Sequence, residues 1–212
     1  MNTKKNVCDY KYAICISGAA SGETVEQSGS LAKRLGAAIA RRGHTVITGA
    51  TIGLPYMAAL GAYEQGGLSI GYSPASSIRE HLRKYRLPCN AFDHINFTGM
   101  NYIGRDFQLV TAADAMIVVG GRFGTLNEFT IALEMRKPLG ILLNSGGTAD
   151  LAPSLLKVLD PPKGQLIFQD ESPEALVDAL IDSLDEHYKD VREDMARAEQ
   201  WFGDGNNSGH SG

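Results

Sequence analysis

The chain has 212 residues, of which 43% are hydrophobic and 21% are charged, and its formal net charge is −4. The length suits one domain with a sizeable core, and the negative balance argues against broad binding to nucleic acid or to an anionic membrane surface, while leaving room for a local pocket that binds one small anion. The cysteines are scarce, which argues against a disulfide framework. The first residues lack the apolar core of a signal peptide, and no apolar run is long enough to span a bilayer. A cytoplasmic location is therefore expected.

Seven short, mostly apolar runs of β-forming residues alternate with helical stretches along the chain. We expect strands at Lys11–Ser17, His44–Thr48, Leu68–Tyr72, Phe92–Phe97, Ala115–Val119, Leu139–Leu143 and Gln165–Gln169. Apolar strands separated by helices are typical of parallel βαβ units. The sequence therefore predicts an α/β fold, a Rossmann-like, doubly wound, mostly parallel sheet of about seven strands with helices on both faces. Residues 11–202 would form this single domain, between an N-terminal tail at 1–10 and a disordered tail at 203–212.

Two helices carry clear boundary signals. Val25–Arg42 repeats apolar residues at helical spacing, and Gly43 follows it in the position that glycine favours after a helix. Ser172–Glu186 begins with Ser172 as its N-cap and has a proline in its first turn. A polar helix running through Trp201 is expected to pack loosely or to meet a partner chain.

The segment GGRFGTLNE, at residues 120–128, connects the fifth expected strand to a helix. Its glycines let the backbone bend and let a ligand approach without a Cβ in the way. We expect the helix to begin near Thr125, where free N–H groups and the helix dipole favour a phosphate. Glu128 would then lie one turn into the helix, on the rim of the same pocket.

The same residues allow a purely structural interpretation. Thr125 and Glu128 have the spacing of a capping box, with the threonine as N-cap and the glutamate at N3. The glycine spacing matches neither the dinucleotide fingerprint GxGxxG nor the P-loop GxxxxGK[ST], so neither NAD binding nor ATP hydrolysis is indicated.

Several motifs in a consistent order along the chain support a binding site. The segment Gly99–Arg105 opens the helix before the fifth strand, and Gly121–Glu128 follows that strand. In the first half, Cys15–Gly18, Thr48–Leu54 and Gly67–Pro74 end three strands with glycine or proline. Residues 12–145 thereby resemble the LONELY GUY phosphoribohydrolases, long misnamed lysine decarboxylases, whose hallmark is an Arg-Lys pair on one helix and PGGxGTxxE after the next strand.

Several positions depart from that pattern. Asp106 stands where the family has lysine, Gly120 replaces its proline, and Arg122 replaces a glycine. The family's GGGxxGLM is reduced to Gly49 and Gly53. These features resemble a sister branch grouped with the molybdenum-cofactor carriers, which share the fold and bind a phosphorylated pterin without cleaving it.

The resemblance implies a nucleoside 5′-monophosphate phosphoribohydrolase that releases free base and ribose 5-phosphate. Arg105 and Glu128 would be its catalytic residues, with Arg105 lowering the pKa of Glu128 and keeping it ionised. Alternatively, Arg105 is an exposed helix arginine paired with Asp106 or Asp114. No metal or other cofactor is implied.

The expected ligand contacts lie at the strand ends and in the loop after the fifth strand. They are Ser17, Gly18, Gly49, Asn101, Gly121, Arg122, Phe123, Gly124 and Thr125. Thr98 would contact the nucleotide or cap the helix of Arg105. The histidines are scattered at positions expected at the surface or at strand ends, which argues against a metal site. They are His44, His81, His94, His187 and His210.

Three functions remain open at this stage. The first is the hydrolase, and the second is a nucleotide or molybdenum-cofactor binding protein, a carrier or sensor without catalysis. The third is an unrelated Rossmann-like protein without a site. A homodimer or higher oligomer is expected, with a phosphorylated small molecule rather than nucleic acid or membrane as the partner.

Overall fold

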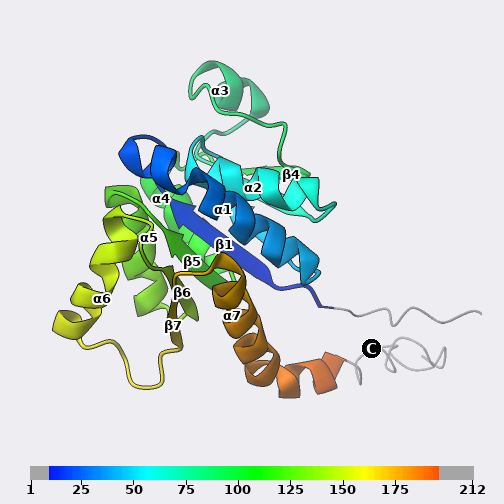
Figure 1. Cartoon of the computed structure of the whole chain (residues 1–212). Coiled ribbons are helices and arrows are strands. Elements are labelled where there is room, and N and C mark those ends of the chain that lie inside the picture. Colours follow the sequence, from blue (N-terminus) through cyan, green and yellow to red (C-terminus); the bar gives the residue numbers. More distant parts are fainter. Residues whose placement is uncertain (1–9, 196–212) are drawn as a thin grey trace, which may run out of the picture.

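A seven-stranded sheet forms the centre of the computed structural model, which describes residues 10–195 (Figure 1). The strand order is β4-β3-β2-β1-β5-β6-β7, and every neighbouring pair is parallel. The strands are β1 (Ala13–Gly18), β2 (Thr45–Thr48), β3 (Ser69–Ser73), β4 (His94–Phe97), β5 (Ala115–Val119), β6 (Leu139–Leu142) and β7 (Ile167–Asp170). The predicted doubly wound parallel sheet is confirmed. The predicted tails, apart from Tyr10, lie outside the described residues.

Helices cover both faces of the sheet (Figure 1). One face carries α1 (Glu23–Arg41), α2 (Leu54–Glu64) and α7 (Pro173–His187). The other carries α4 (Asn101–Ala112), α5 (Phe123–Glu134) and α6 (Gly147–Leu159). The short helix α3 (Ile78–Arg83) follows β3 and stands out beyond the sheet.

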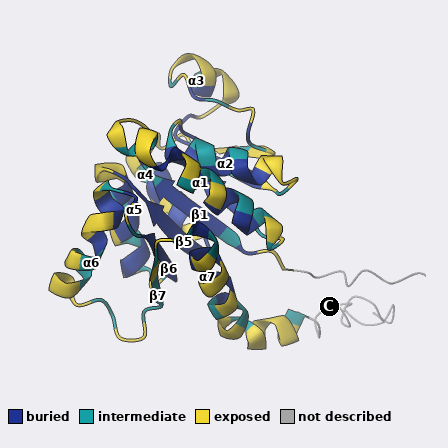
Figure 2. Cartoon of the chain, viewed as in Figure 1, coloured by how far each residue is buried: buried dark blue, intermediate teal, exposed yellow. Residues whose placement is uncertain are grey.

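Side-chain alternation along the central strands builds two separate cores. In β1, Ile14 and Ile16 pack towards α1, α2 and α7, whereas Cys15 packs towards α4, α5 and α6. All five residues of β5 are buried, because helices cover the strand on both sides. Figure 2 shows this buried sheet between layers whose outer surfaces are exposed.

Helix boundaries agree with the sequence in some places and differ in others. Gly43 follows α1 with φ +81°, and the Ser172 hydroxyl caps α7 by accepting from Ala175 N, as predicted. The alternative that Thr98 is the N-cap of α4 is wrong, since Met100 takes that position; the Thr98 hydroxyl donates to the Ser73 carbonyl and accepts from Met100 N. Residues 189–195 are helical. The rest of the predicted polar helix, with Trp201, lies outside the described part of the chain.

The strand order reverses direction near the centre of the sheet. Strands added after β1 lie on one side of it and β5 lies on the other, so the winding reverses between β1 and β5. In open parallel sheets, ligands bind beyond the carboxyl ends of the strands at such a point.

Within residues 10–195, no helix is long and apolar enough to cross a bilayer.

Candidate functional site

A pocket of about 330 Å³ opens at the carboxyl edge of the sheet, where β1, β2 and β5 end. The residues that line it come from β1, from the loops after these strands and from the N-terminal halves of α2, α4 and α5. They are Ile16, Gly18, Ala19, Ala20, Ser21, Gly49, Thr51, Pro55, Tyr102, Ile103, Arg105, Asp106, Arg122, Phe123, Gly124, Thr125 and Glu128. Arg105 and Glu128 therefore share one cavity. Its size falls at the lower end of the range for small-molecule sites.

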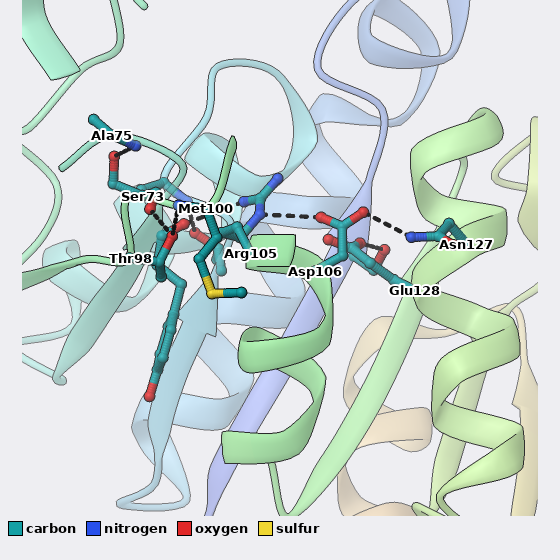
Figure 3. Close-up of polar contacts among 12 residues, drawn as sticks. Ser73, Ala75, Thr98, Met100, Arg105, Asp106, Asn127 and Glu128 are labelled. Atoms are coloured by element: carbon teal, nitrogen blue, oxygen red, sulfur yellow. Dashed lines mark hydrogen bonds and ion pairs between the residues drawn. The ribbon is translucent and has the colours of Figure 1, made fainter. Parts of the chain in front are cut away.

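Arg105 is held at the inner end of the pocket by two protein acceptors (Figure 3). Its Nε donates to Asp106 Oδ1 at 3.0 Å, and its Nη1 donates to the Tyr72 carbonyl at 3.2 Å. The residue is only 5% exposed. The alternative of an exposed arginine is thus wrong about exposure, because α4 points this side chain inward, but right about the pairing with Asp106.

Gly49 makes room for this arginine. A Cβ at that position would lie 1.7 Å from Arg105 Nη1, far inside van der Waals contact. Of the two glycines that remain in the motif after β2, Gly49 and Gly53, the first is therefore the one that lies against the guanidinium.

Asp106 turns into the same buried cluster (Figure 3). Its second carboxylate oxygen accepts from Asn127 Nδ2 at 3.0 Å, and its side chain is 4% exposed. The sequence did not point to Asn127, because an asparagine beside Glu128 matches no motif that predicts a role in the site. The contact links α4 to α5.

Glu128 lies beside Asp106 and is 7% exposed. The Ser17 hydroxyl donates to its Oε2. Burial raises the pKa of Glu128 to about 7, Arg105 opposes that rise, and the neighbouring Asp106 adds to it. The net shift is upward, which contradicts the expectation that Arg105 keeps Glu128 ionised. Arg105 does favour the ionised form, but desolvation outweighs its attraction.

The start of α5 differs from the predicted start near Thr125. The helix begins at Phe123 with Arg122 as N-cap, and its first backbone hydrogen bond runs from Leu126 N to the Arg122 carbonyl. Thr125 is thus already the third helical residue, and the capping-box interpretation is wrong. The N–H groups of residues 123–125 precede that first bond, as in helix ends that bind anions.

The loop before α5 is shaped by Gly121 and fixed by α6. Gly121 has φ +111°, and a Cβ there would lie 2.5 Å from Thr125 Cγ2. The first amides of α6 bind the loop from behind, with Thr148 N 3.2 Å from the Gly121 carbonyl and Ala149 N 2.9 Å from the Gly120 carbonyl. Because α6 binds these carbonyl oxygens, the loop keeps a fixed shape beside the pocket.

The rim of the pocket is exposed, apolar and positively charged. Ile103 is 74% exposed and Phe123 is 85% exposed. Arg122 is exposed beside them. The Arg105 guanidinium lies 5.9 Å from the ring centre of Tyr102, which also lines the pocket.

Three predicted contact residues lie outside the pocket wall. Ser17 lies beneath it and binds Glu128, while Gly121 shapes the loop. Asn101 accepts a hydrogen bond from the Tyr85 hydroxyl at 2.7 Å.

The expectation that every histidine lies at the surface or a strand end is wrong for His81. It is fully buried, with Nδ1 2.8 Å from Ser73 Oγ, because α3 folds it back onto the end of β3. In the described range, no group of three or more His, Cys, Asp or Glu residues is arranged to hold a metal ion.

Comparison with known proteins identifies a matching family model and a related sequence. Residues 11–177 match the model of the SLOG cluster4 family. An uncharacterized protein of Archaeoglobus fulgidus is 37% identical over 123 residues, which cover 58% of this chain and 75% of that protein.

Two solved structures resemble the whole fold. The molybdenum cofactor binding protein of Rippkaea orientalis is 26% identical with a TM-score of 0.66, covering 84% of this chain and 99% of that one. The molybdenum cofactor carrier protein of Chlamydomonas reinhardtii is 25% identical with a TM-score of 0.67, covering 82% and 99%. The predicted relation to the LONELY GUY-like proteins, on a branch near these carriers, is confirmed.

Proposed function

This chain belongs to the SLOG cluster4 family, and we propose that its pocket binds a nucleoside 5′-monophosphate or a related phosphorylated small molecule and hydrolyses its N-glycosidic bond. The products would be a free base and ribose 5-phosphate. The observation that carries this proposal is the position of Glu128, a buried carboxyl that lines the pocket together with the start of its own helix, α5.

The start of α5 is suited to hold the phosphate. Its free amides and the positive end of the helix dipole favour an anion, and the Thr125 hydroxyl lies in the same turn. Arg122, at the N-cap, adds a positive charge at the rim. A phosphate bound here directs the sugar towards Glu128.

Glu128 is suited to the chemical step. As water attacks the anomeric carbon, the bond to the base nitrogen breaks, the base leaves with the bonding electrons, and the sugar passes through an oxocarbenium-like state. An ionised Glu128 stabilises this positive charge and takes the proton from the attacking water. The Ser17 hydroxyl holds the carboxylate in position. The Arg105 guanidinium, fixed by Asp106, is placed to contact ribose oxygens.

The test is release of free base from AMP, GMP, CMP and UMP by the purified protein, followed by chromatography. Glu128→Gln keeps the shape of the side chain but removes the base, so release should fall by about a hundredfold or more. Glu134→Gln, on the exposed side of the same helix, is the matched control and should keep full activity. Equal activity of the two variants would exclude Glu128 as the catalytic base.

A second candidate is a binding protein without turnover. It is favoured by the hydrogen bonds from Arg105 to Asp106 and to the Tyr72 carbonyl, because they leave the guanidinium fewer N–H donors for a substrate. It is also favoured by the relatives that are molybdenum cofactor carriers. Tight calorimetric binding of a nucleotide or a phosphorylated pterin without base release would select this function. No thermal shift with any phosphorylated ligand would argue against both.

We also propose a homodimer or higher oligomer. One side of α4 exposes a stripe of large apolar side chains beside the pocket, and the start of α5 continues it. The stripe consists of Met100, Tyr102, Ile103, Phe107 and Phe123. Contiguous exposed apolar surface of this kind often marks a protein contact.

A further inference from the structure

We propose that Asp106 determines which ligands the pocket accepts, by giving the pocket a negative inner end and leaving its positive charge at the rim. Such a pocket takes a phosphate only at the rim, together with an uncharged, hydrogen-bonding group at the inner end. This inference rests on the proposed phosphorylated ligand and adds a selection rule to it. Asp106 would then be a specificity-determining residue.

The first support is the way Asp106 neutralises Arg105. The two side chains pair at 3.0 Å and are only 4–6% exposed, so water screens their interaction weakly. The remaining carboxylate oxygen accepts a hydrogen bond from Asn127 Nδ2, so both oxygens of Asp106 have partners within the protein. Because Arg105 also donates to the Tyr72 carbonyl, its charge is already largely satisfied within the protein.

The second support is the carboxyl group of Glu128 at the same end. Together, two carboxyl groups and one guanidinium make the inner end neutral when Glu128 is protonated and negative when it is ionised. A phosphate dianion placed there would meet this negative end in a poorly hydrated environment, where like charges repel strongly. Sugar hydroxyls or ring N–H groups can instead donate to Glu128. Burial is the main cause of the raised pKa of Glu128, and the neighbouring Asp106 adds to it.

The third support is the opposite polarity of the rim. Arg122 is exposed at the N-cap of α5, and the first-turn amides of that helix lie next to it. The positive groups therefore lie where the pocket meets solvent, and the negative groups lie where it is buried. A ligand that carries phosphates at both ends would have to place one of them against Asp106 and Glu128.

Two sugar phosphates test this rule, because they differ only at one end. Ribose 5-phosphate has one anionic end and ribose 1,5-bisphosphate has two. By titration calorimetry at pH 8, we expect the native protein to prefer the monophosphate by about tenfold or more, which is a modest electrostatic difference. Asp106→Asn keeps the shape of the side chain and frees the charge of Arg105, so the preference should shrink to nearly equal affinity.

Two further variants complete the design. Glu128→Gln also removes negative charge from the inner end and should narrow the preference even where Asp106→Asn fails to fold. Arg122→Gln removes a positive charge at the rim and should weaken both ligands together, leaving their ratio nearly unchanged.

The outcomes separate this inference from the proposed function. If the native protein binds ribose 5-phosphate but shows no preference, or if the preference survives in every folded variant of Asp106 and Glu128, the selection rule is overturned and the phosphate site stands. If neither sugar phosphate binds at millimolar concentration, the selection rule is overturned, while base release from the nucleotides still decides the proposed function.

Discussion

The burial of Glu128 should make the stability of this protein depend on pH in a way that one substitution removes. The folded protein holds this carboxyl away from water, next to Asp106, and raises its pKa from 4.5 to about 7. Ionising it in the folded state is therefore unfavourable. Glu128→Gln has nearly the same shape and stays neutral at every pH, so it removes that cost.

The size of the effect follows from the two pKa values. Below pH 4.5 the carboxyl is protonated in both the folded and the unfolded chain, and its titration has no effect on stability. Above pH 7 it is ionised in both, and the folded state bears the full difference. At 1.36 kcal/mol per pKa unit, this amounts to about 3 kcal/mol of lost stability. The native protein loses this stability as the pH rises through the interval between the two values.

Urea unfolding of the native protein and of Glu128→Gln at pH 5 and pH 8 measures the difference. Subtracting the two free energies of unfolding cancels the titration of all other groups that the substitution leaves unchanged. The variant should gain about 2–3 kcal/mol relative to the native protein between these pH values. Glu134→Gln, an exposed glutamate on the same helix, should show no such gain. A constant difference between the native protein and Glu128→Gln would show that Glu128 titrates normally when folded, and the reasoning would be refuted.

Three other substitutions test the geometry of the site. Gly49→Ala places a methyl group against Arg105 and should cost about 1–3 kcal/mol in urea unfolding; unchanged stability would mean that the guanidinium moves aside freely. Ser17→Ala removes a hydrogen bond that lowers the pKa of Glu128, so base release, which requires the ionised form, should need a higher pH; a pH profile that stays in place would contradict this role. Ile103→Glu puts a charge into the exposed stripe and should convert an oligomer to a monomer in light scattering; a native protein that is already monomeric at micromolar concentration would refute the oligomer.

Much of the architecture was readable from the order of residues. Strands such as Ala115–Val119 are apolar throughout because helices cover both faces of the parallel sheet. This pattern can be recognised in one sequence without an alignment. The placement of Arg105 and Glu128 in one pocket was also predictable, since both lie near strand ends that meet at one edge. The start of α5 was harder to predict. Thr125 and Glu128 fit a capping box by spacing, but the helix begins at Phe123, and its N-cap is Arg122, three residues before Thr125.

The charge balance of the site was beyond the reach of sequence patterns. An arginine near a glutamate lowers the glutamate pKa, and that much can be stated without a structure. Whether burial outweighs the arginine depends on how completely β1, α4 and α5 exclude water, and on where the neighbouring Asp106 points. Here Asp106, at the position where the LONELY GUY pattern has lysine, turns inward, pairs with Arg105 and lies against Glu128. An aspartate there places negative charge at the buried end of the pocket, and ligand choice, rather than fold, is the property that this residue should determine.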